Sequence, residues 1–240
     1  MSATIVRSNQ RFETNAGWLE SFHSFSFGGH YDPRNTHHGL LLVANDDTVR
    51  PGQGFGTHGH RDMEIVSWVL EGELEHRDSE GNHGVIRPGL IQRMSAGTGI
   101  QHSEMNGSAT ESVHFLQMWV PPDTTGIAPG YEELDVGDRL DSGDLVVVAS
   151  GQGHEGAVRL HQAEAVMAVA RPPEGAPIEI DTAPAIHLYV ARGAVTTELD
   201  GEPVVLGEGD ALRLFDRGVA VTGAADSTEI VVWSTGVGQA

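Results

Sequence analysis

Residues 64–100 read "EIVSWVLEGELEHRDSEGNHGVIRPGLIQRMSAGTGI", and this stretch decides the fold class. Short apolar runs rich in Val, Ile and aromatic residues alternate in it with turns built from Gly, Asp, Asn and Pro. Runs of this kind, closely spaced and bounded by turn residues, are typical of the strands of an all-β sandwich or barrel. Similar runs occur along most of the chain, which predicts an all-β protein.

The same pattern returns half a chain later. Residues 185–221 read "AIHLYVARGAVTTELDGEPVVLGEGDALRLFDRGVAV", in which Gly193 matches Gly72 at a turn between two apolar runs. Self-similarity at a fixed offset indicates two copies of one structural unit. The Pro- and Gly-rich segment 120–133 is the natural boundary between them. We therefore predict two tandem β domains, residues 1–124 and residues 125–240.

Composition excludes several classes of protein. The chain has no cysteine, which excludes disulfides, thiolate metal sites and a cysteine nucleophile. All 14 basic residues are arginine, which excludes a lysine Schiff base. The net charge of −20 repels nucleic acid and anionic membranes, so we expect no direct nucleic-acid partner. No apolar stretch is long enough to span a membrane, and no export signal is visible, which predicts a cytoplasmic protein.

His58 and His60 stand just before the opening stretch and are separated by one residue. Residues i and i+2 of a β-strand project to the same side, so the two imidazoles share one space. His102 and Glu104 repeat this spacing about 40 residues later. Three imidazoles and a carboxylate suit Fe, Mn, Co, Ni, Cu or Zn. Glu64 also has the strand parity to face this site, so spacing alone does not choose between the two carboxylates.

The repeat provides a control for the imidazoles. Shifting His58 and His60 by about 121 residues places them on Glu179 and Asp181. The second copy keeps the apolar runs and the turns but has no imidazole at these positions. If the scaffold needed the histidines, both copies would carry them. The histidines are therefore predicted to serve a site.

Two motifs and four longer segments carry a resemblance to a known family. Gly52, His58, His60, Glu64 and Gly72 resemble the first cupin motif, with one extra residue in the last gap. "GTGIQHSEMN" (97–106) resembles the second, with glycine at position 97 where proline is usual. "SFHSFSFGGHYDP" (21–33), "HHGLLLVANDD" (37–47), residues 54–89 and "QRMSAGTGIQHSEMN" (92–106) are similar to segments of the pirin family of bicupins. This resemblance covers most of residues 15–125, whereas the second half shows only the cupin pattern.

The resemblance implies two tandem cupin (jelly-roll β-barrel) domains with one metal, usually iron as Fe(II), in the first. It also implies that the carboxylate ligand is Glu104. Glu64 is then a candidate to orient a ligand histidine by accepting a hydrogen bond from its free ring N–H. Bacterial members of this family resemble quercetin 2,3-dioxygenases. In such an enzyme Glu104 would take the proton of a flavonol hydroxyl before dioxygen opens the central ring with loss of carbon monoxide.

The apolar lining of such a pocket is predicted to include Phe55, Met63 and Met118. His76 and His83 flank the turn "RDSEGN" and are expected to be exposed, because hairpin turns normally face solvent.

A second hypothesis is a non-enzymatic, metal-containing regulator that docks a protein partner. Residues 125–240 carry 19 acidic residues against 6 arginines, which would suit such docking. Access to the metal distinguishes the two hypotheses. A pocket large enough for a small aromatic substrate and dioxygen favours the enzyme, and a site closed by the loop after "MWVPP" favours the regulator.

Overall fold

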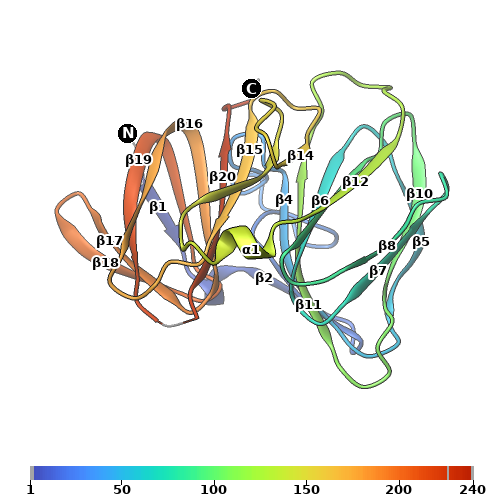
Figure 1. The fold of residues 1–240 in the computed structure, drawn as a ribbon, viewed down its shortest axis with the longest axis horizontal. Coiled ribbons are helices and arrows are strands. Elements are labelled where there is room, and N and C mark those ends of the chain that lie inside the picture. Colours follow the sequence, from blue (N-terminus) through green and yellow to red (C-terminus); the bar gives the residue numbers. More distant parts are fainter. Residues whose placement is uncertain (1–2, 226, 239–240) are drawn as a thin grey trace.

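The structure, a computed structural model, describes residues 3–225 and 227–238 and consists almost entirely of β-strands (Figure 1). The strands are β1 (Ala3–Val6), β2 (Phe12–Asn15), β3 (Leu19–His23), β4 (Val43–Val49), β5 (Gly54–His60), β6 (Glu64–Glu71), β7 (Leu74–Asp78), β8 (His83–Ile86), β9 (Leu90–Ser95), β10 (Ile100–Asn106), β11 (Val113–Val120), β12 (Gly130–Asp135), β13 (Val146–Ser150), β14 (Val158–Arg159), β15 (Ala165–Ala170), β16 (Pro177–Arg192), β17 (Ala194–Leu199), β18 (Glu202–Gly207), β19 (Ala211–Gly223) and β20 (Glu229–Thr235). A 3-10 turn (Ser8–Gln10) and one short helix, α1 (Gly137–Leu140), complete the described elements. None of the described helices has the length and apolar character needed to cross a membrane. The predicted all-β class is confirmed.

The strands form three sheets in two groups that lie side by side (Figure 1). A seven-stranded sheet, β12-β9-β6-β11-β4-β3-β2, and a four-stranded sheet, β5-β10-β7-β8, make up the first group. One nine-stranded sheet makes up the second, with the path β14-β13-β15-β20-β16-β19-β17-β18 and β1 paired to β19. Most neighbours are antiparallel, as expected for barrels built from hairpins.

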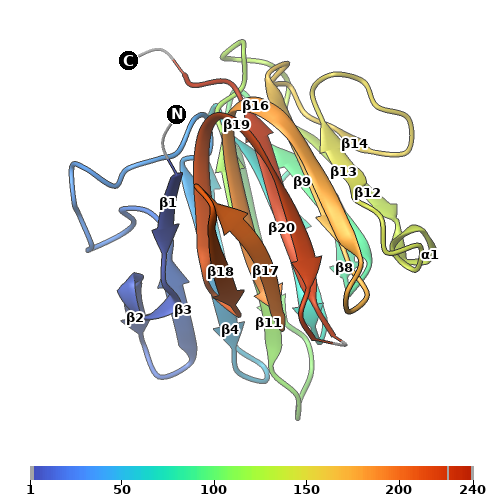
Figure 2. The ribbon, with the colours of Figure 1, turned by 90° about the vertical axis from the view of Figure 1, so that its left-hand side faces the viewer.

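Each half contributes a strand to the other. β1, at the start of the chain, pairs with β19 of the second half (Figure 2). β12, which follows the 121–129 connection, pairs with β9 and so extends the seven-stranded sheet of the first half. Residues 130–135, assigned to the second domain from the sequence, thus lie in a sheet of the first. The division at residues 124 and 125 stays a prediction.

Two glycines that the repeat aligned occupy the same kind of turn. Gly72 and Gly193 have φ angles of 77° and 67°, a region that residues with a Cβ rarely adopt. A Cβ at Gly72 would lie 2.6 Å from the carbonyl oxygen of Ser112, and one at Gly193 would lie 3.0 Å from Oγ1 of Thr228. Both turns therefore favour glycine for its conformation and for its small size.

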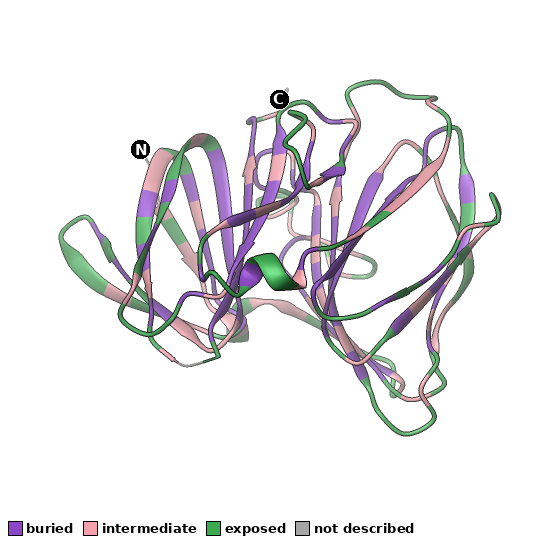
Figure 3. Cartoon of the chain, viewed as in Figure 1, coloured by how far each residue is buried: buried purple, intermediate pink, exposed green. Residues whose placement is uncertain are grey.

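The seven-stranded sheet separates two environments. Cross-strand partners place Ser67, Gln117, Asn45 and His23 in one row across β6, β11, β4 and β3. Adjacent residues of a strand face opposite sides, so the next residues along face the second half. Burial is concentrated where the two groups of strands face each other (Figure 3).

Met118 belongs to the core between the halves and not to the pocket predicted from the sequence. It lies in a buried cluster that also contains Trp68, Tyr189 and Trp233. The indole Nε1 of Trp233 donates to Sδ of Met118 at 3.1 Å. The error has a simple cause: Met118 is one residue out of phase with Gln117, so it projects from the opposite face of β11.

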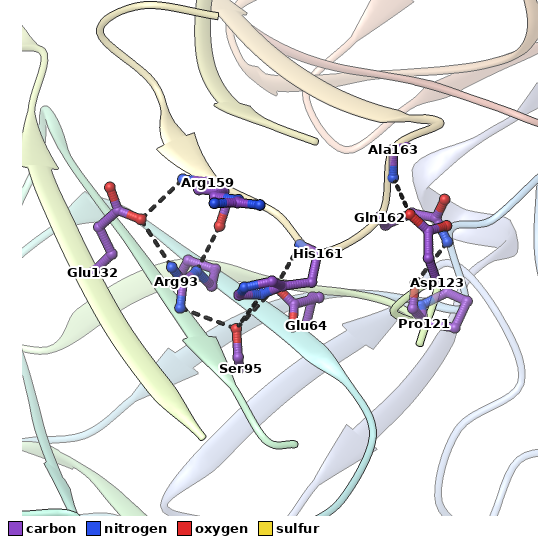
Figure 4. A network of polar contacts seen from close by, with 10 residues as sticks. All are labelled: Glu64, Arg93, Ser95, Pro121, Asp123, Glu132, Arg159, His161, Gln162 and Ala163. Carbon is purple, nitrogen blue, oxygen red and sulfur yellow. Dashed lines mark hydrogen bonds and ion pairs between the residues drawn. The ribbon is translucent and has the colours of Figure 1, made fainter. Parts of the chain in front are cut away.

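Glu64 also projects toward the second half. Its Oε2 accepts hydrogen bonds from the Ser95 hydroxyl at 3.0 Å and from the backbone N–H of His161 at 3.1 Å (Figure 4). Nδ1 of His161 lies 3.2 Å from the same oxygen. Among the described residues, Glu64 makes no hydrogen bond with the three clustered histidines of the first half. Glu64 therefore does not orient a ligand histidine as predicted, because its position on β6 directs the side chain toward the interface between the halves.

We expect Glu64→Gln to lower the free energy of unfolding by about 1–3 kcal/mol, because it weakens hydrogen bonds at a buried acceptor. Denaturant unfolding of the metal-free protein measures this change. Metal content should be unaffected. The exposed Glu111→Gln is a matched control that should leave both quantities unchanged. Loss of metal from the Glu64 variant would contradict the interface role.

Candidate metal centre

β5 and β10 bring three of the predicted side chains together. The two strands are antiparallel, with His58 opposite His102 and His60 opposite Ile100. One ring nitrogen from each of His58, His60 and His102 lies within 4.8 Å of the other two. The i, i+2 spacing of His58 and His60 and the register of β5 against β10 thus produce one cluster of imidazoles.

The nitrogen atoms of this cluster are suited to hold a cation. Nδ1 of His58 lies 2.8 Å from the carbonyl oxygen of Gly56 and donates to it, which makes Nε2 the nitrogen that can bind a metal. Nε2 of His60 and both ring nitrogens of His102 are buried without a hydrogen-bond partner among the described residues. Buried polar atoms without a partner are costly, and a bound metal would satisfy Nε2 of His60 and one of the two nitrogens of His102. The residues therefore fit a metal ion.

The protonation states agree with this role. Burial, aided by the neighbouring His58, lowers the pKa of His60 to about 4. Burial, aided by the neighbouring His58 and His60, lowers the pKa of His102 to about 2. Both imidazoles are thus neutral at pH 7, which is the form that binds metal ions.

Glu104 lies two residues beyond His102, and a register shift between them places it opposite Phe55. Its Oε2 accepts a hydrogen bond from Nε2 of Gln117 at 2.7 Å, and its Oε1 lies 3.4 Å from the Ser67 hydroxyl. Burial raises the pKa of the Glu104 carboxyl, while the bond from Gln117 opposes that rise. The carboxylate oxygens of Glu104 are not among the ligand atoms that lie within 4.8 Å of one another. The Glu104 side chain nevertheless lines the same cavity as His58 and His60.

This cavity has a volume of about 320 Å³ and reaches two of the clustered histidines, His58 and His60. That volume lies in the range of small-molecule sites. Phe55, Phe27 and Trp119 supply apolar surface to its lining. Among the described residues that line it, none comes from the 121–129 connection after "MWVPP". This connection contacts the turn between β9 and β10 instead, where the backbone N–H of Thr98 donates to the carbonyl oxygen of Ile127 at 2.8 Å.

Met63, the remaining predicted pocket residue, packs beside the cavity lining without joining it. It contacts a small cluster that contains Ile65, Met94 and Ile100. The residue precedes β6, so the pattern of that strand does not determine its direction.

The sequence reasoning missed several polar residues of the cavity wall. Gln117 from β11, Ser21 and His23 from β3, and Asn45 and Asp47 from β4 all line it. Burial raises the pKa of the Asp47 carboxyl to about 7. The signal was present as polar residues at alternate positions, 21 and 23 and then 45 and 47, but such alternation is equally typical of a solvent-facing strand.

His76 corrects a second expectation. It was expected to be exposed beside a hairpin turn, yet its side chain is only 1% exposed. β7 pairs with β10 so that His76 lies opposite Glu104, and its ring centroid is 5.3 Å from that of His102. Its Nε2 lies 3.2 Å from Oδ2 of Asp78. Only the strand pairing shows that this face of the hairpin is turned inward.

The equivalent strands of the second half enclose an apolar core. Ile178 is paired with Val221 and Ile180 with Val219, and all four side chains are buried in one cluster. Glu179, which the repeat aligned with His58, is exposed instead. The alignment from sequence is therefore one residue out of phase with the inward-facing positions. Its conclusion is unchanged, because those positions in the second half carry no imidazole.

Comparison with known proteins identifies the family. The family model described as Pirin matches residues 5–120. A "putative quercetin 2,3-dioxygenase" of Mycobacterium tuberculosis is 57% identical over 201 residues, which is 82% of each chain. The "Quercetin 2,3-dioxygenase" of Escherichia coli K12 is 46% identical over 158 residues, covering 66% of this chain and 67% of that protein.

Solved structures agree over the whole chain. The crystal structure of YhhW from Escherichia coli superposes with a TM-score of 0.89 at 34% sequence identity and covers 100% of both chains. The structure of bacterial pirin YhhW in complex with nickel(II) gives a TM-score of 0.88 at 34% identity, covering 98% of this chain and 100% of the other. These matches confirm the resemblance found in the sequence and the architecture of two tandem cupin barrels. The chain belongs to the pirin family.

Proposed function

We propose that this chain is a metal-dependent oxygenase of the quercetin 2,3-dioxygenase type, which cleaves the central ring of a flavonol with dioxygen. The observation that carries the proposal is the cluster of three imidazoles with unpartnered nitrogens beside a cavity of about 320 Å³. The names of the Escherichia coli and Mycobacterium tuberculosis relatives support the same activity.

The proposed ligands are His58, His60, His102 and Glu104, and the proposed metal is Fe(II). A set of imidazole and carboxylate ligands without thiolate suits Fe, and it also suits Mn, Co, Ni, Cu or Zn. The nickel(II) complex of a pirin 34% identical to this chain supports a divalent ion. When bound, the metal would act as a Lewis acid toward the flavonol hydroxyl and as the redox centre for dioxygen chemistry.

The side chains around the metal have separate tasks. Glu104 accepts the proton of the substrate hydroxyl, and it is the proposed catalytic residue. Gln117 and Ser67 hydrogen-bond its two oxygens and hold the carboxylate in one orientation. Trp119, whose ring centroid is 4.9 Å from that of His60, and Phe55 offer aromatic surface to a flat substrate and exclude water.

The test is anaerobic reconstitution with Fe(II), followed by quercetin and then dioxygen. We expect the flavonol absorbance to disappear and about one carbon monoxide to be released for each flavonol consumed. The same protein treated with a chelator is the control and should leave the absorbance intact. Full occupancy by iron without turnover of any member of a flavonoid panel would overturn the proposal.

The regulator hypothesis receives less support from the geometry. Ligands in solution can approach the imidazoles through the cavity, and the connection after "MWVPP" does not line it. A protein partner of the acidic second half and the cytoplasmic location both stay predictions.

A further inference from the structure

The metal cavity has a second polar region that the proposed mechanism does not use. His58 and His60 reach the cavity from the four-stranded sheet. Ser21, His23 and Asp47 line it from β3 and β4, which belong to the seven-stranded sheet. The cavity is therefore bounded by polar groups from both sheets of the first barrel, with the aromatic side chains Phe55 and Trp119 among its other walls.

Most hydrogen-bonding atoms of this second region already have partners. Nδ1 of His23 lies 2.9 Å from Oδ1 of Asn45, and its Nε2 lies 2.8 Å from the Thr14 hydroxyl. These contacts use both ring nitrogens and hold the imidazole in place. The His23 ring thus has little hydrogen-bonding capacity left for a ligand, whereas the side-chain amide of Asn45 keeps its two N–H donors.

Asp47 differs from His23, and it is the residue of this region with an unpaired acceptor. Its side chain is 2% exposed, and Oδ1 accepts a hydrogen bond from the Ser21 hydroxyl. Among the described residues, Oδ2 has no hydrogen-bond partner and the carboxylate has no arginine or histidine within ion-pair distance. Oδ2 is not fully enclosed by protein atoms, so a ligand in the cavity can reach it. A buried carboxylate with one free oxygen at a cavity wall is costly unless something binds it.

We propose that Asp47, oriented by Ser21, determines the specificity of the cavity for polyhydroxylated flavonols; this inference rests on the proposed function. Its free oxygen accepts a hydrogen bond from a phenolic hydroxyl other than the one directed to the metal. A flavonol that lacks such hydroxyls leaves this buried oxygen unpaired. Sites built to bind a hydroxyl reject analogues without it for this reason.

Binding without turnover tests the proposal. Protein loaded with nickel(II) is titrated under anaerobic conditions with quercetin and with 3-hydroxyflavone, which keeps only the metal-directed hydroxyl. The titration is run at about pH 8.5, where the Asp47 carboxyl is mostly ionised. A hydrogen bond to this charged acceptor predicts that the wild type binds quercetin about 10- to 100-fold more tightly. In Asp47→Ala this ratio should fall to within about threefold of unity, mainly through weaker binding of quercetin. Asp47→Asn, which keeps a neutral acceptor, should give an intermediate ratio.

Thr48→Ala is the matched control, because Thr48 follows Asp47 on β4 and projects from the other face of the sheet. It should keep the wild-type ratio, and all variants should keep wild-type nickel content and circular dichroism. An unchanged ratio in Asp47→Ala, or an equal loss of affinity for both flavonols, would overturn the role of Asp47 while the proposed function stands. A wild type that binds neither flavonol would overturn the proposed function and this inference with it.

Discussion

His102→Ala is expected to abolish metal binding while the protein remains folded. His102 is 2% exposed, and its two nitrogens have no hydrogen-bond partner among the described residues. Loss of an outer-shell partner of a ligand typically weakens metal binding by 10- to 100-fold, so loss of the ligand itself should exceed about 100-fold. Metal content after dialysis should fall from about one ion per chain to nearly none, and oxygenase turnover should fall to background.

Unfolding measurements separate loss of the site from loss of the fold. Ions that bind only the folded state stabilise it by about 2.7 kcal/mol at 100 times their dissociation constant. Wild type should gain stability of this order on adding metal, whereas His102→Ala should gain none. His83→Ala is the matched control, because this imidazole lies on β8 of the same sheet with an exposed side chain. Retention of one tightly bound ion by His102→Ala would contradict the three-imidazole site.

Glu104→Gln is expected to reduce turnover of quercetin by about 10²- to 10⁴-fold, the usual contribution of a positioned general base. Glutamine keeps the volume of the side chain but cannot take up the proton of the substrate hydroxyl. Single-turnover kinetics of the iron-loaded variant, at measured iron occupancy, test this expectation.

The control for this variant is Glu73→Gln, an exposed carboxylate that should leave turnover unchanged. Wild-type turnover in Glu104→Gln would remove Glu104 from the chemistry. A loss that only follows reduced iron occupancy would assign Glu104 to metal binding and not to proton transfer.

The repeat, the turns and the alternating apolar runs were sufficient to predict the all-β class, because these features depend on neighbours in the sequence. The clustering of His58 and His60 was also predictable, since the i, i+2 rule needs only a strand. The proximity of His102 to this pair depends on a further assumption, that the two strands are neighbours. The structure confirms it, because His102 lies opposite His58.

The errors share one physical cause. Alternation along a strand says which residues share a face, but it does not say what covers that face. Met118 and Glu64 were therefore assigned to the pocket side of a sheet whose other face packs against the second half. His76 was placed in solvent for the same reason, because the packing of its hairpin against β10 is a long-range contact.

By itself, the sequence determined that this is a bicupin of the pirin family with three imidazoles grouped in its first half. The tertiary structure decided which face of the seven-stranded sheet meets the cavity, and so it brought Gln117 to Glu104 and Asp47 to the cavity wall. It also placed the Glu64 side chain in the interface between the halves. Local spacing defines a strand and its two faces, whereas only the pairing and stacking of distant strands define the surroundings of each face.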